Sequence, residues 1–106
     1  MELKVKYFEC DLSNDRVDSN IGTRAVTLGS EQECMRYCNE LLTQDYFIRE
    51  RTWSEISDKN YLNWEDRYAI ILLEVQVDGE IVLEKQVDEE ILILVCEEKL
   101  EEYHEC

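Results

Sequence analysis

The last third of the chain, residues 74–106, combines a high density of charge with long apolar runs. It contains twelve acidic residues and two lysines, so it carries a formal net charge of −10 out of −15 for the whole chain. The longest apolar runs, residues 69–73 and 91–96, lie directly before this segment and within it. A segment that is both strongly apolar and strongly acidic has to bury one face and present the other to solvent as a charged surface.

The length of 106 residues fits one domain and is sufficient to bury a core without disulfides or metal. The chain contains no proline and three glycines, so we expect no long linker and a single domain over residues 1–106. No apolar stretch approaches the ~18–20 residues that a membrane helix needs. Residues 1–7 lack the apolar core of a signal peptide. We therefore expect a cytoplasmic protein with no membrane partner.

The pattern of apolar and polar side chains predicts strands in five segments. These are residues 3–10, 23–28, 46–53, 67–77 and 81–87. In the fourth segment, strict alternation places four apolar residues on one face, namely Ile71, Leu73, Val75 and Val77.

The pair Asp78-Gly79 is a strong hairpin signal between the last two of these strands. A two-residue loop would set Val77 opposite Glu80 and mix apolar with polar faces. We expect a three-residue loop instead, because it sets Val77 opposite Ile81 and keeps the apolar faces together.

A helix is predicted over about residues 31–43. Ser30 and Glu33 form a capping box at its start. Five residues then fall on one apolar stripe at helical spacing, namely Cys34, Tyr37, Cys38, Leu41 and Leu42.

A second helix is predicted over residues 88–103, with Asp88 as its N-cap. Its inner face would hold Ile91, Leu92, Val95, Cys96, Lys99, Leu100 and Tyr103. A buried strand over residues 91–96 is the competing interpretation, because isoleucine and valine are enriched there. Together the elements predict an α+β fold with a single antiparallel-rich sheet of about four to five strands and one or two helices packed on it.

The net charge of −15 repels nucleic acid and anionic membranes and attracts basic protein surfaces. The strongest basic surfaces in a cell are those that bind DNA or RNA. Solubility alone also accounts for acidic composition, but the concentration of acids at one end of the chain favours a binding surface. On a helix, the carboxylates of successive turns lie about 5–6 Å apart, similar to neighbouring phosphates of one strand. The predicted partner-binding residues are Glu89, Glu90, Glu97, Glu98, Glu101, Glu102, Asp78 and Glu80.

The sequence contains no phosphate-binding glycine loop and no catalytic signature, so we expect no enzyme, no catalytic residue and no cofactor. Cys34 and Cys38 have the i, i+4 spacing of two metal ligands, which His104 and Cys106 would complete as a zinc site. The same two cysteines lie on the stripe that a helix must bury, so we favour core packing and predict no metal site. Five cysteines without a C-x-x-C motif favour reduced thiols.

The chain resembles the small acidic proteins of phages and other mobile elements. The resemblance rests on size, charge and the segment Thr-Leu-Gly-Ser-Glu-Gln-Glu-Cys (residues 27–34) followed by Tyr-Phe-Ile-Arg-Glu (residues 46–50). Anti-CRISPR proteins and DNA-mimic inhibitors share this composition. The resemblance implies action in the host bacterial cytoplasm, against a Cas effector or another nucleic-acid enzyme.

The leading hypothesis is a non-enzymatic inhibitor whose acidic face occupies the nucleic-acid-binding surface of a host defence nuclease, without binding nucleic acid itself. The alternative is a structural or oligomerisation module of a phage or bacterial assembly, built through an exposed strand or hairpin face. A metal-binding protein is a third hypothesis. The sequence leaves a monomer and a homodimer open.

Overall fold

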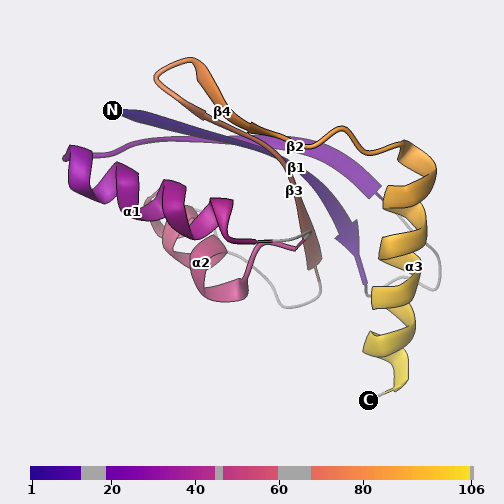
Figure 1. The fold of residues 1–106 in the computed structure, drawn as a ribbon. Helices are drawn as coiled ribbons and strands as arrows, with labels where there is room; N and C mark the ends of the chain where they lie inside the picture. Colours follow the sequence, from indigo (N-terminus) through magenta and orange to yellow (C-terminus); the bar gives the residue numbers. More distant parts are fainter. Residues whose placement is uncertain (13–18, 45–46, 60–67, 106) are drawn as a thin grey trace.

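The computed structural model describes residues 1–12, 19–44, 47–59 and 68–105. The strands are β1 (Glu2–Asp11), β2 (Ser19–Thr27), β3 (Tyr68–Val77) and β4 (Glu80–Glu84). The helices are α1 (Glu31–Leu42), α2 (Glu50–Lys59) and α3 (Glu89–Glu105). The strands form one antiparallel sheet in the order β2-β1-β3-β4, with the three helices packed on it (Figure 1). The predicted α+β fold is confirmed.

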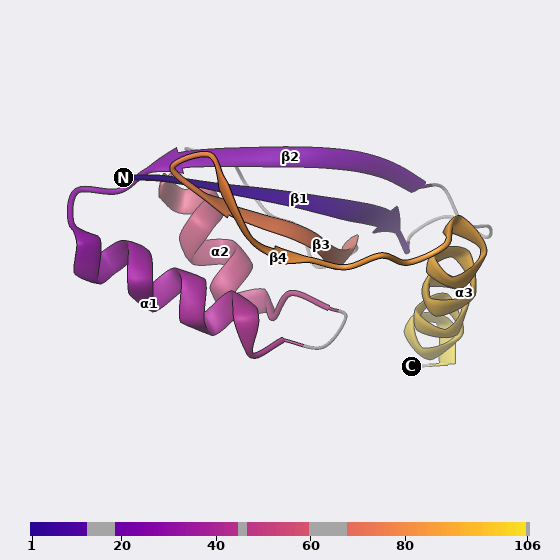
Figure 2. The same ribbon diagram turned by 45° about the horizontal axis from the view of Figure 1, so that its top comes forward.

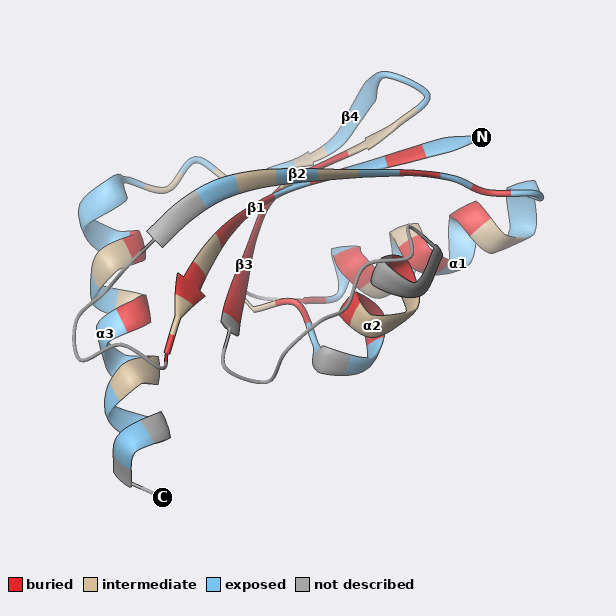
Figure 3. Cartoon of the chain, turned by 180° about the vertical axis from the view of Figure 1, so that it is seen from behind, coloured by how far each residue is buried: buried red, intermediate tan, exposed pale blue. Residues whose placement is uncertain are grey.

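The sheet separates two cores, because side chains alternate between its faces. On one face, Val5, Tyr7 and Leu72 pack with buried residues of α1 and α2. On the other face, Phe8 and Ile71 pack with buried residues of α3. Figures 2 and 3 show α1 and α2 together on one side, and α3 at the end of the sheet where β1 terminates.

A β-bulge at Leu73 changes which side chains share a face of β3. Tyr7 pairs with Leu72 and Lys6 pairs with Glu74, so Leu73 has no partner on β1. An extra residue of this kind interrupts strict alternation. Val75 therefore packs in the same core as Leu72, whereas Leu73 packs on the α3 side. The predicted face with Leu73 and Val75 together is wrong for this reason.

The β3–β4 hairpin has a two-residue turn. Asp78 (φ 49°) and Gly79 (φ 84°) both adopt left-handed conformations, as a type I′ turn requires. Val77 pairs with Glu80, so the predicted three-residue loop is wrong at the tip.

A second bulge corrects the register of this hairpin. Gln76 pairs with Ile81 and Val75 with Leu83, which leaves Val82 without a partner. The predicted three-residue loop also set Val75 opposite Leu83, and this pairing is present. The sheet keeps both the favourable turn and the apolar face by adding one residue to β4.

Helix α1 begins as predicted, because the backbone N–H of Glu33 donates to Ser30 Oγ at 3.1 Å. Cys34, Tyr37 and Leu41 are buried. The stripe is incomplete at its end, since Leu42 is exposed.

Helix α2 replaces most of the strand predicted over residues 46–53. Phe47 forms an isolated antiparallel bridge with Ile71, but the chain is helical from Glu50. Trp53 and Ile56, one helical turn apart, are buried in the core with α1. The Gln44 side chain links the two helices, since its amide donates to Thr52 Oγ1 at 3.3 Å. Tertiary packing of these side chains outweighs the strand propensity of the segment.

The contact between Tyr7 and Gly22 generates a prediction about stability. A Cβ at position 22 would lie 2.5 Å from the Tyr7 ring, and that ring is held edge-on against Trp53 at 4.8 Å between centroids. We expect Gly22→Ala to lower the free energy of unfolding by about 1–3 kcal/mol through overpacking. Urea denaturation measures the change. The matched control is Gly29→Ala, where the new methyl group meets nothing within 4 Å. Equal stability of the two variants would contradict the prediction.

Candidate acidic binding surface on helix α3

Helix α3 begins where the sequence predicts. The N–H groups of Ile91 and Leu92 donate to the Asp88 carbonyl at 3.0 and 3.1 Å, which places Asp88 at the N-cap. The helix runs for 17 residues, from Glu89 to Glu105. The competing prediction of a strand over residues 91–96 is wrong. A helix of this length extends about 25 Å.

Two residues one turn apart anchor the helix to the sheet. Leu92 and Cys96 are buried against a core that includes Phe8, Cys10 and Ile71. Three predicted inner-face residues are half-buried, namely Val95, Lys99 and Leu100. The side chain of Tyr103, also predicted there, lies outside the described residues.

The Lys99 ammonium lies 4.9 Å from the centroid of the Phe47 ring. This distance permits a cation–π contact, which attaches the middle of the helix to the segment that precedes α2. The predicted inner face is therefore confirmed around Leu92, Cys96 and Lys99, but not at Ile91, which is 43% exposed.

The face of α3 that points away from the sheet is acidic along its second half. All six acids predicted on this helix are exposed. At 3.6 residues per turn, five of them fall on the side opposite Leu92 and Cys96. These five are Glu90, Glu97, Glu98, Glu101 and Glu102. The blue outer side of α3 in Figure 3 shows this exposure.

Apart from Glu90, the first half of the same outer face is apolar. Ile91 and Leu94 are 43% and 59% exposed and lie one helical turn apart. The six consecutive apolar residues 91–96 contain the signal for this exposure, because a helix resting on one sheet cannot bury all sides of such a run. The prediction placed Ile91 inward and did not assign Leu94. The outer face thus joins an apolar half to an acidic half.

The two remaining predicted site residues lie elsewhere. Asp78 and Glu80 are exposed in the β3–β4 hairpin, at the other end of the molecule from α3 (Figure 1). The Asp78 carboxylate accepts the backbone N–H of Glu2 at 2.8 Å, and its own N–H donates to Glu2 O at 2.9 Å. Asp78 therefore connects the hairpin to β1 by two hydrogen bonds. The eight predicted acids form two separate groups, one on α3 and one in the hairpin.

The acids at the end of α3 are placed unfavourably for helix stability. The negative end of the helix dipole favours cations, yet His104 alone provides a basic side chain in the last turn. Like charges at i, i+4 destabilise a helix by roughly 0.2–0.5 kcal/mol per pair, as at Glu97 with Glu101 and Glu98 with Glu102. Lys99 compensates part of this charge by pairing with Glu102 at 3.2 Å.

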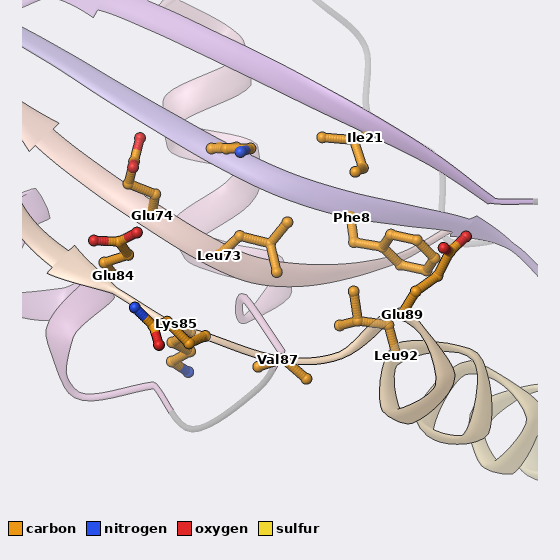
Figure 4. A pocket seen from close by; sticks show the side chains of 11 residues that line it. Phe8, Ile21, Leu73, Glu74, Glu84, Lys85, Val87, Glu89 and Leu92 are labelled. Atoms are coloured by element: carbon orange, nitrogen blue, oxygen red, sulfur yellow. The ribbon is translucent and has the colours of Figure 1, made fainter.

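A hollow of about 650 Å³ lies between the start of α3 and the sheet (Figure 4). Apolar side chains line it near the helix, including Phe8, Leu73 and Leu92. Its far end is charged, with Lys6 and Glu74 among the lining residues. Glu89 also lines this hollow. Of the six predicted acids of α3, it is therefore the one that borders the sheet rather than the outer face.

The cysteines of the described residues occupy core positions. Cys34 is buried and Cys38 half-buried on α1, while Cys10 of β1 and Cys96 of α3 are buried in the core between the sheet and α3. Burial raises the pKa of the Cys34, Cys38 and Cys96 thiols, and Cys96 also hydrogen-bonds Cys10. Such thiols stay protonated at neutral pH and are poor nucleophiles and metal ligands.

The groups considered for a zinc site do not meet. His104 lies on α3, at the opposite end of the molecule from α1 with its two cysteines (Figure 1), and Cys106 lies outside the described residues. Within the described ranges, no three His, Cys, Asp or Glu side chains are placed to hold a metal ion. In the same ranges, no helix is long and apolar enough to cross a membrane.

Comparison with protein-family models, curated proteins and solved structures found no match to this chain. Function is therefore inferred from the chemistry of α3 and its neighbours.

The unfavourable charge on α3 predicts a gain of stability on neutralisation. We expect the combined substitutions Glu97→Gln, Glu98→Gln and Glu101→Gln to raise the free energy of unfolding by about 0.5–1 kcal/mol at low salt, because they remove the like-charge pairs at i, i+4. Thermal unfolding followed by circular dichroism measures this change.

The matched control carries Glu89→Gln and Glu90→Gln at the start of the same helix. Acids in the first turn are favourable, so this pair should lower stability. A triple variant no more stable than the unsubstituted protein would contradict the prediction.

Proposed function

We propose that this protein is a non-enzymatic inhibitor that uses the outer face of α3 to occupy a basic nucleic-acid-binding surface of another protein. A Cas effector or another nucleic-acid enzyme of a bacterial host is the partner class that this surface fits. The observation that carries the proposal is the exposed cluster of Glu97, Glu98, Glu101 and Glu102, which sets like charges at i, i+4 and extends toward the negative end of the helix dipole.

The position of these acids favours binding over solubility. Acids that serve solubility alone contribute equally well in loops or at helix starts, where they cost nothing or stabilise the helix. Residues that reduce stability are typical of functional sites, where binding or activity maintains them. The second half of α3 fits this description.

The spacing of the acids supports nucleic-acid mimicry. Carboxylates on successive turns are about 5–6 Å apart, so they can meet a row of Lys and Arg side chains that binds successive phosphates. Charge complementarity of this kind speeds association and makes it sensitive to salt.

The apolar half of the outer face supports the same class of partner. Proteins that bind single-stranded nucleic acid combine a basic groove with exposed aromatic side chains on which bases stack. Ile91 and Leu94 lie next to the acids, so they can cover such aromatic side chains while the acids meet the basic groove. Burial of these two exposed apolar side chains in an interface would contribute to affinity through the hydrophobic effect.

A displacement experiment tests the proposal. Fluorescently labelled oligonucleotides are bound to a panel of purified Cas effectors and single-strand-binding proteins, and the protein is titrated into each complex. We expect release of the oligonucleotide from at least one partner. Release should require more protein as salt rises from about 50 to about 500 mM, because the Debye length falls roughly threefold.

Two variants that remove the same number of acids distinguish the effect of the α3 surface on displacement from the effect of net charge. We expect Glu97→Gln with Glu98→Gln and Glu101→Gln to weaken displacement at least tenfold, about 1.4 kcal/mol. The control removes three exposed acids near the hairpin, Glu2, Glu80 and Glu84, and should displace like the unsubstituted protein. No displacement across the panel, or an equal loss in the control, would overturn the proposal.

A further inference from the structure

Strand β2 is the outermost strand of the sheet and is nine residues long. It pairs with β1 without a bulge. Beyond it, the described part of the chain provides no further strand. One side of β2 therefore presents backbone groups to which no neighbouring strand is paired.

The hydrogen bonds at the start of β1 identify these groups. Leu28 N–H donates to Met1 O at 2.8 Å, and the Met1 amino group donates to Leu28 O at 3.2 Å. Such exchanging pairs recur at every second residue of an antiparallel ladder. Val26, Arg24 and Gly22 therefore direct their N–H and C=O groups toward β1. The residues that direct theirs away are Ser19, Ile21, Thr23, Ala25 and Thr27.

Apart from the half-buried Arg24, this edge lacks the features that normally protect a sheet edge. Natural edge strands are short, bulged, or carry lysine or proline. The opposite edge fits this description, since β4 has five residues, a bulge, and the acids Glu80 and Glu84. Residues 19–30 contain no acid in a chain with 26, and Arg24 is their one charged residue. The side chain of Ile21 is 57% exposed.

We propose that β2 pairs antiparallel with β2 of a second copy across a twofold axis at Thr23, which joins two sheets into one of eight strands. This register pairs all nine residues of the strand and sets Thr23 against Thr23 and Ile21 against Ala25. Arg24 faces Gly22 of the second copy, so no like charges lie directly opposite. An isologous contact of this kind is the commonest way to form a dimer.

The distribution of charge favours a second copy of the chain as the partner of the β2 edge, because residues 19–30 contain no acid and the acidic helices lie away from the contact. Ser19 pairs with Cys10 beneath α3, whereas Thr27 pairs with Glu2 near the hairpin. Antiparallel pairing sets the Ser19 end of one strand against the Thr27 end of the other. The two acidic helices then lie at opposite ends of the joined strands, about 30 Å apart along them. This exceeds the Debye length of about 8–10 Å, so their repulsion is largely screened.

The dimer goes beyond the proposed function and does not depend on it. The β2 edge and the outer face of α3 are different surfaces, so pairing leaves the acids of both copies free.

Sedimentation of the full chain tests the proposal. At about 100 μM protein and about 500 mM salt, we expect a mass of twice 12.7 kDa. Lower salt should weaken the dimer, because each copy carries −15. Binding through the acids of α3 has the opposite salt dependence. The combined Glu97→Gln, Glu98→Gln and Glu101→Gln variant should also dimerise normally, so the two proposals fail separately.

Substitutions at Thr23 locate the contact. Thr23→Pro removes an N–H that points away from β1, so it should give a monomer and leave the β1 ladder intact. Thr23→Val keeps the N–H and should dimerise. Thr23→Lys, which sets two lysines opposite each other, should weaken dimerisation at least tenfold, and it decides the question if the proline variant does not fold.

The other sheet edge provides a matched control. Lys85 N–H donates to Leu73 O at 2.8 Å, so the N–H of Glu84 points away from β3. Glu84→Pro should therefore leave the dimer unchanged. A monomeric unsubstituted protein in high salt, full dimerisation of folded Thr23→Lys, or loss of the dimer in Glu84→Pro would overturn the proposal.

Discussion

The pairing of β1 with β3 is the interaction on which the rest of the structure depends. It sets Tyr7 and Leu72 toward α1 and α2, and Phe8 and Ile71 toward α3. Both helical layers use the same two strands, so neither core forms without this ladder. The bulge at Leu73 then ends the apolar part of the α3 face, since Glu74 follows it.

The position of α3 is explained by the end of the apolar surface at the bulge. Beyond the bulge, the sheet on the α3 side presents Lys4, Lys6 and Gln76, which cannot bury a helix. Only the end of the sheet around Phe8 and Ile71 is apolar, so α3 is attached there and stands at the end of the molecule (Figure 1). A helix held on a small area leaves most of its surface in solvent. The exposure of the acids and of Leu94 follows from this limited contact between α3 and the sheet.

Local sequence signals predicted much of the fold. Ser30 caps α1, Asp78-Gly79 makes the turn, and Asp88 precedes α3, because caps and turns depend on neighbouring residues. The two bulges were not predicted, since Leu73 and Val82 are displaced by the register of strands distant in sequence.

Helix α2 was missed for a related reason. Trp53 and Ile56 have helical spacing, but the aromatic and branched residues before them favoured a strand. For the candidate site, helical periodicity was sufficient to predict that the acids of α3 are exposed. Sequence spacing contains no information about the distance between Asp78 and α3, because only the tertiary fold sets it.

The charge of the molecule is segregated rather than uniform, and this bears on its interpretation. A chain that used acids for solubility alone would distribute them over both sheet edges and the helix ends. Here the longest exposed edge, β2, has no acid, while the end of α3 holds acids that its dipole disfavours. Electrostatic repulsion between copies is therefore smallest where strands can pair, and attraction to a basic surface is largest at the far end of α3. The two surfaces respond to salt in opposite directions, so ionic strength distinguishes self-association from binding to a basic partner.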